Sequence, residues 1–126
     1  MGYNSMSEEE IRAAVIEEGR KRFLNIGIAN TQMNLIAKSV GISRSTLYLY
    51  FPSKVELVFH VARELLGSVT RSVNQHIDSA NCQSGFSAVH EYLSFLLNFY
   101  RANTSIARFI DEFDSFTVLY GAVDAE

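Results

Sequence analysis

The stretch from residue 36 to residue 47 has the spacing of small, glycine and apolar residues that a helix-turn-helix requires. Ala37 is small where two helices would cross, and Gly41 allows the positive φ of a tight turn between them. The corner between the helices would be filled by apolar side chains, namely Ile36, Val40, Ile42 and Leu47. The pattern therefore predicts two short helices joined by a sharp turn.

Helix-start and helix-stop signals flank this stretch. Ser7 and Glu10 match a capping box, which opens a first helix that ends at Gly27. Thr31 is expected to cap the second helix, and Ser43 is expected to cap the third. Three helices are therefore expected in the first part of the chain.

Three further helices are expected after Pro52. A long fourth helix, capped by Ser53, should reach Ser79, and a sixth should run from Ile106 until it stops near Gly121. The fifth helix carries residues that its spacing predicts to face inward, namely Phe86, Val89, Leu93, Leu96, Leu97 and Tyr100. No segment alternates as a strand would, so we expect an all-α fold.

Composition narrows the class of protein. The chain has 126 residues, of which 48% are apolar, enough for one domain or two small interlocking ones. Its beginning lacks the order of a signal peptide, and no apolar run reaches the roughly 18 residues of a membrane span. We expect a cytoplasmic protein with no membrane partner. One cysteine and three histidines without chelating spacing predict no metal site and no cofactor.

The net charge of −3 is unevenly distributed. Residues 19–54 include six basic residues and no acidic one, whereas residues 55–126 include four basic and nine acidic ones. A basic face can attract phosphates even when the whole chain is acidic. The charge pattern therefore allows nucleic acid as a partner of the first part only.

The third helix has the character of a recognition helix. It begins after Ser43, and its outward residues would be Arg44, Ser45, Thr46, Tyr48 and Leu49. In a helix-turn-helix the second helix enters the major groove with its positive N-terminal end toward the DNA. Double-stranded DNA is therefore the expected partner of this helix.

Six short motifs follow one another in this region: Thr31-Gln32-Met33, Leu35-Ile36-Ala37, Gly41-Ile42-Ser43, Thr46-Leu47-Tyr48, Tyr50-Phe51-Pro52-Ser53-Lys54 and Glu56-Leu57. Together they resemble the DNA-binding domain of the TetR/AcrR family of bacterial transcriptional regulators. The resemblance covers Ile11 to about Ala62. It implies a three-helix DNA-binding domain, residues 7–53, joined by the long helix to an apparently truncated effector-binding and dimerisation region, residues 54–126.

The resemblance also implies which residues contact DNA. These positions are Thr31, Gln32, Arg44, Ser45, Thr46, Tyr48, Tyr50 and Lys54. Ser45 and Thr46 would face base edges, while the others would mostly contact phosphates. For Tyr50, a place in the core is an equally good reading, and Phe51 is expected to be core. Arg20, Lys21 and Arg22 are expected to form a solvated basic face.

The family resemblance implies a homodimer on a palindromic operator, released by a small-molecule effector. Family members usually continue with further helices that form the dimer interface. The 126 residues are therefore expected to be either a fragment of a longer regulator or a shortened member that dimerises otherwise or not at all. We therefore expect a weak dimer or a monomer in dilute solution. The predicted function is sequence-specific repression of transcription. The alternative is a helical protein-interaction module that uses the helix-turn-helix only as a scaffold.

The second half of the chain is rich in aromatic residues. Most are expected to be core, but Tyr92, Phe95, Phe99 and Phe113 are candidates for an apolar ligand pocket. Asp111, Glu112 and Asp114 could serve a hydrolase, but no nucleophile or glycine-rich loop accompanies them. We expect a solvated acidic patch there, no catalytic residues, and no enzyme activity.

Overall fold

The computed structural model describes residues 6–124, and within this range it contains six helices and no strand. The all-α prediction is therefore confirmed. The helices are α1 (Glu8–Ile26), α2 (Met33–Val40), α3 (Arg44–Tyr50), α4 (Lys54–Ala80), α5 (Gly85–Ala102) and α6 (Thr104–Asp124).

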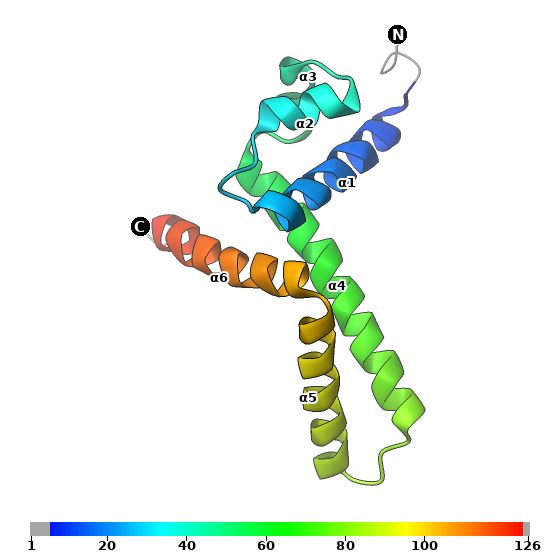
Figure 1. Cartoon of the computed structure of the whole chain (residues 1–126). Helices are drawn as coiled ribbons and strands as arrows, with labels where there is room; N and C mark the ends of the chain where they lie inside the picture. Colours follow the sequence, from blue (N-terminus) through cyan, green and yellow to red (C-terminus); the bar gives the residue numbers. More distant parts are fainter. Residues whose placement is uncertain (1–5, 125–126) are drawn as a thin grey trace.

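The long helix α4 is the axis of the molecule (Figure 1). Helices α1, α2 and α3 gather around its first part, and α5 runs back along its second part. Helix α6 then turns away from α5 and packs against both α1 and α4. Helix α6 thus lies beside the end of α1 and the first part of α4.

Most helix ends follow the predicted signals, including the end of α1 at Gly27 and the cap of α4 by Ser53. Ser7 Oγ accepts the Glu10 N–H at 3.2 Å, and the Glu10 carboxylate accepts the Ser7 N–H at 2.9 Å, which completes the capping box. Gly41 has φ 86°, and its N–H donates to the carbonyl of Ala37. Ser43 Oγ accepts the N–H of Thr46 at the start of α3.

The main core lies between α1, α2, α3 and the first half of α4. The apolar residues predicted for the corner of the helix pair enter it: Ile36 and Leu47 are 0% exposed, and Ile42 is also buried. Phe51 is buried as well, as the sequence predicted. The corner therefore holds α3 in a fixed position against α2.

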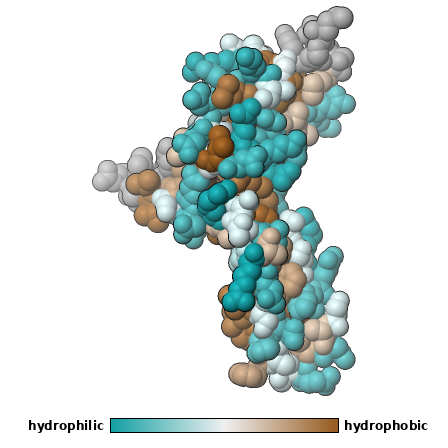
Figure 2. Space-filling model, in the orientation of Figure 1, coloured by the Kyte–Doolittle hydropathy of each residue, from teal (hydrophilic) through white to brown (hydrophobic). Residues whose placement is uncertain are grey.

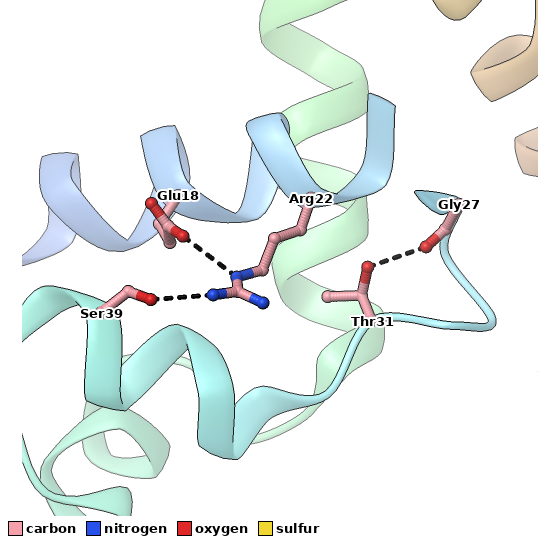
Figure 3. Close-up of polar contacts among 5 residues, drawn as sticks. All are labelled: Glu18, Arg22, Gly27, Thr31 and Ser39. Atoms are coloured by element: carbon pink, nitrogen blue, oxygen red, sulfur yellow. Dashed lines mark hydrogen bonds and ion pairs between the residues drawn. The ribbon is translucent and has the colours of Figure 1, made fainter. Parts of the chain in front are cut away.

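The prediction that Thr31 caps α2 is wrong. The N-cap is Gln32, whose side chain makes no capping hydrogen bond. Thr31 is instead buried, and its hydroxyl donates to the carbonyl of Gly27 at 2.7 Å (Figure 3). The Thr31 hydroxyl is thus bonded to the carbonyl at the end of α1 and does not cap α2.

Two predictions for the later helices are also wrong. Helix α6 continues past Gly121 to Asp124. On α5, most of the stripe that was expected to face inward is exposed, namely Phe86, Val89, Leu93 and Leu97. The other two members of the stripe, Leu96 and Tyr100, are half-buried and line the groove against α4, and Phe95 lies beside His76. Figure 2 shows apolar surface along the outer side of the α4–α5 hairpin, away from the contact between the two helices.

Helix α6 joins the end of α1 through a buried aromatic contact and two polar ones. Phe109, 1% exposed, stacks on Phe23 with ring centroids 6.3 Å apart. The preceding residue, Arg108, donates to the carbonyl of Leu24 at 2.7 Å, and Glu112, about one turn further on, accepts the N–H of Ala29 at 2.9 Å. The positive Arg108 thus neutralises the negative C-terminal end of α1, which has no basic residue in its last turn.

Replacing Gly27 with alanine should lower the free energy of unfolding by about 1–3 kcal/mol, because its φ of 88° and ψ of 165° suit only glycine. The added methyl group would also lie 2.9 Å from Oε2 of Glu112. Thermal and urea unfolding measure this loss. Gly85 is the matched control, because its φ is not positive and a methyl group there meets no atom within 4 Å. Equal stability of the Gly27→Ala and Gly85→Ala proteins would contradict the role of Gly27.

Candidate DNA interface

Among the described residues, no other helix makes a polar contact with the exposed face at the start of α3. Arg44 and Ser45 are exposed in its first turn, and Thr46 is half-buried. The Thr46 hydroxyl lies 2.8 Å from Ser43 Oγ, so it supports the cap of the helix as well as facing outward. Leu49, 80% exposed, lies on the same outer surface. This surface can enter a groove of DNA because no other element of the described chain covers it.

Tyr48 is only half-buried, not fully exposed, and its ring packs partly against the core. The guanidinium of Arg44 lies 5.5 Å from the centroid of that ring. This cation–π contact orients the arginine along the outer side of α3. Tyr48 therefore combines two roles, because it supports Arg44 and still presents an edge at the surface.

Tyr50 is half-buried and packs against the core, yet it also borders a cation. The guanidinium of Arg12 lies 5.2 Å from its ring centroid and 5.9 Å from that of Phe51. Arg12 brings positive charge from α1 to the end of α3, which sequence reasoning missed. No local signal indicates this contact, because 38 residues separate the two partners.

Lys54 is the first residue of α4 and is half-buried. Burial lowers the pKa of its ammonium group, and attraction to the carboxylate of Glu112 acts in the opposite direction. Among the described residues, no carboxylate lies within ion-pair distance of Lys54. Its positive charge is thus available to an anion from outside the protein.

The two remaining predicted contact residues, Gln32 and Thr31, differ in their exposure. Gln32 is exposed at the start of α2, on the same part of the molecule as α3. Thr31 is 3% exposed and uses its hydroxyl inside the fold. Thr31 is therefore too deeply buried to contact a phosphate, and the proposed contact surface does not include it.

The basic cluster of α1 is more neutralised than the sequence predicted. Arg20 pairs with Glu17, and this hydrogen bond holds the pKa of the Glu17 carboxyl below its usual value. Arg22 pairs with Glu18 at 3.0 Å and donates to Ser39 Oγ at 2.8 Å, which joins α1 to α2 (Figure 3). Arg22 therefore helps to pack α1 against α2, and Arg20 is paired within α1, whereas Lys21 is exposed.

The four candidate ligand-pocket residues do not form one pocket. Phe95 and Phe99 stack on each other along α5, with centroids 6.0 Å apart. Phe113 instead contacts Phe59 and Phe109, where α6 meets α4. Of the four, only Tyr92 lines the groove of about 210 Å³ between α4 and α5.

The prediction of a solvated acidic patch at Asp111, Glu112 and Asp114 is partly wrong, because the carboxylate of Glu112 accepts the N–H of Ala29 in the turn after α1.

Other kinds of site find no support in the described part of the chain. Residues 6–124 contain no group of three or more metal-binding side chains. None of the helices in that range is long and apolar enough to cross a membrane. His76 and Glu91 form an ion-pair contact between α4 and α5 at 2.9 Å, which has a structural role.

The α2–α3 pair, in which α3 is the exposed second helix, defines a helix-turn-helix protein. Residues 15–61 match the model of the family described as bacterial regulatory proteins, tetR family. The segment is therefore a tetR-family domain, and the resemblance inferred from the motifs is confirmed. The match includes α2, α3 and the first turns of α4, where all the candidate contact residues lie.

Curated relatives extend the similarity beyond this segment. The nucleoid occlusion factor SlmA of Haemophilus influenzae (strain PittGG) is 28% identical in an alignment of 112 positions that covers 79% of this chain and 49% of that protein. An HTH-type transcriptional regulator of Staphylococcus aureus (strain bovine RF122 / ET3-1) is 31% identical over 102 residues, 81% of this chain and 54% of the relative. The chain thus spans about half the length of the curated relatives it matches. No solved structure matches the chain significantly.

Proposed function

We propose that this chain binds double-stranded DNA through α3 and the start of α4 and regulates transcription. The observation that carries the proposal is the exposed first turn of α3, where Arg44 and Ser45 project from a helix fixed by the buried Leu47. Arg44 and Lys54 would bind phosphates, and Ser45 and Thr46 would reach base edges. The matching family consists of bacterial regulatory proteins, which supports this function.

The contact surface that we propose has three further members. Gln32 is exposed at the start of α2, and Tyr48 and Tyr50 are half-buried residues of α3 that keep part of their side chains at the surface. Arg12 supports Tyr50 from α1, because its guanidinium lies over that ring. A second copy of the chain would place a second α3 about one helical turn, roughly 34 Å, along a palindromic operator.

The finer function follows the family pattern. We propose a cytoplasmic repressor that a small-molecule effector releases from DNA, with residues 7–53 as the DNA-binding domain and residues 54–126 as the effector-binding and dimerisation region. The contacts of Arg108 and Glu112 support this coupling, because they join α6 to the end of α1 and to the turn that leads into α2. No catalytic role is needed for such a protein.

Replacing Arg44 with alanine should weaken binding to duplex DNA about tenfold or more, the usual cost of losing a charged hydrogen bond. Fluorescence anisotropy with a short labelled duplex measures this. Arg101→Ala is the matched control, because it removes the same charge from an exposed position at the end of α5. Equal binding by both variants would contradict the proposed surface. Salt-insensitive binding to a protein partner, with none to DNA, would favour the interaction module.

A further inference from the structure

A groove opens where α6 meets the turn after α1 and the start of α4. Its volume is about 380 Å³, which lies within the range usual for small-molecule sites. Ile28, Val55, Phe116 and Leu119 supply apolar walls, while Lys54 and Glu112 supply charges. The groove is distinct from the one between α4 and α5 that Tyr92 lines.

The walls of the groove differ in exposure. Ile28 is 2% exposed and forms the floor, and Val55 is half-buried beside it. Leu119 is 69% exposed, so it forms an outer rim. An apolar molecule that entered the groove would bury the rim and part of the walls, which favours binding in proportion to the area covered.

The two charges in the groove are in different situations. The carboxylate of Glu112 already accepts the N–H of Ala29 at 2.9 Å. Lys54 has no carboxylate within ion-pair distance among the described residues, and burial disfavours its charged form. The groove therefore complements an anion beside Lys54 better than a cation beside Glu112.

We propose that this groove binds a small carboxylic acid with an apolar body, whose carboxylate pairs with Lys54 and whose body lies against Phe116 and Leu119. The effect on DNA rests on the proposed function, in which Lys54 also binds a phosphate. One ammonium group cannot pair fully with both anions. The acid and the DNA therefore compete for Lys54, and each weakens the binding of the other.

Displacement of anilinonaphthalene sulfonate, a fluorescent amphipathic anion, by octanoate tests the site without DNA. Octanoate should displace the dye from the wild-type protein better than octylammonium does. Leu119→Asp should weaken the displacement about tenfold, because it places a like charge at the rim. Val118→Asp is the matched control: Val118 is 72% exposed, next to Leu119, and does not line the groove. It should behave as the wild type.

A second variant removes the complementary charge. Lys54→Met keeps an unbranched apolar side chain, removes the charge, and should abolish the preference for octanoate over octylammonium. Thermal unfolding shows whether each variant is folded, and the exposed position of Leu119 keeps that variant informative if Lys54→Met unfolds. Equal displacement from the Leu119→Asp and Val118→Asp proteins, or by octanoate and octylammonium from the wild type, would overturn the proposal.

The effect on DNA is measured separately. Octanoate should weaken duplex binding by the wild type and by Val118→Asp, but much less by Leu119→Asp. Normal DNA binding with no octanoate-specific dye displacement would reject the groove as a site while leaving the proposed function intact. Octanoate-specific displacement with no DNA binding by any protein would reject the proposed function while leaving the acid site intact.

Discussion

Replacing Leu47 with alanine should lower the free energy of unfolding by about 2–5 kcal/mol. Leu47 is 0% exposed and lies in the corner between α2 and α3. The truncation removes apolar burial and leaves a cavity that the neighbouring Ile36 and Phe51 cannot fill. Because α3 has only seven residues, it is too short to be stable without this contact. DNA binding should fall together with stability.

Leu49→Ala is the control for Leu47→Ala. Leu49 is two residues further along the same helix and is 80% exposed, so its truncation should change stability by less than about 0.5 kcal/mol. Urea unfolding followed by circular dichroism compares the two variants. If Leu49→Ala were the more destabilised, the orientation of α3 would be wrong and the proposed contact surface would lie on the wrong face.

Replacing Phe109 with alanine should cost about 3–5 kcal/mol of stability. Phe109 is 1% exposed and lies between the rings of Phe23 and Phe113, with centroids 6.3 and 6.1 Å away. Its loss should also release α6 from the end of α1, because Arg108 and Glu112 depend on this packing to reach their backbone partners.

Phe86→Ala is the control for Phe109→Ala, since Phe86 is 84% exposed at the start of α5. Its truncation should leave stability almost unchanged. Hydrogen exchange at the amide of Ala29, which donates to Glu112, reports on the docking of α6. That exchange should accelerate in Phe109→Ala more than in Phe86→Ala. Similar stability and similar exchange in both variants would contradict the docking of α6 on α1.

The helix-turn-helix could be predicted from the sequence because its determinants are local. The turn at Gly41, the cap at Ser43 and the burial of Leu47 each depend on residues a few positions away. Thr31 shows the limit of this reasoning. A threonine at that position favours capping of α2, but in the folded turn its hydroxyl donates to the carbonyl of Gly27 instead.

The placement of α5 and α6 could not be predicted, because periodicity does not say which apolar face finds a partner. Helix α5 has apolar residues on more than one face, and the face that includes Leu93 and Leu97 remains exposed. The contacts of α6 join residues far apart in the sequence: 84 positions separate Arg108 from Leu24. Such pairs depend on the path of the whole chain, and no local pattern encodes them.

The salt dependence of duplex DNA binding tests the central claim most directly. Each phosphate that the protein neutralises should add about −0.9 to the slope of the logarithm of the binding constant against the logarithm of the salt concentration. With Arg44 and Lys54 as the ionic contacts, we predict a slope of about −2 for each bound protomer, or near −4 for two. The Arg44→Ala protein should lose about half of that slope. A slope near zero, or one that Arg44→Ala leaves unchanged, would contradict the account.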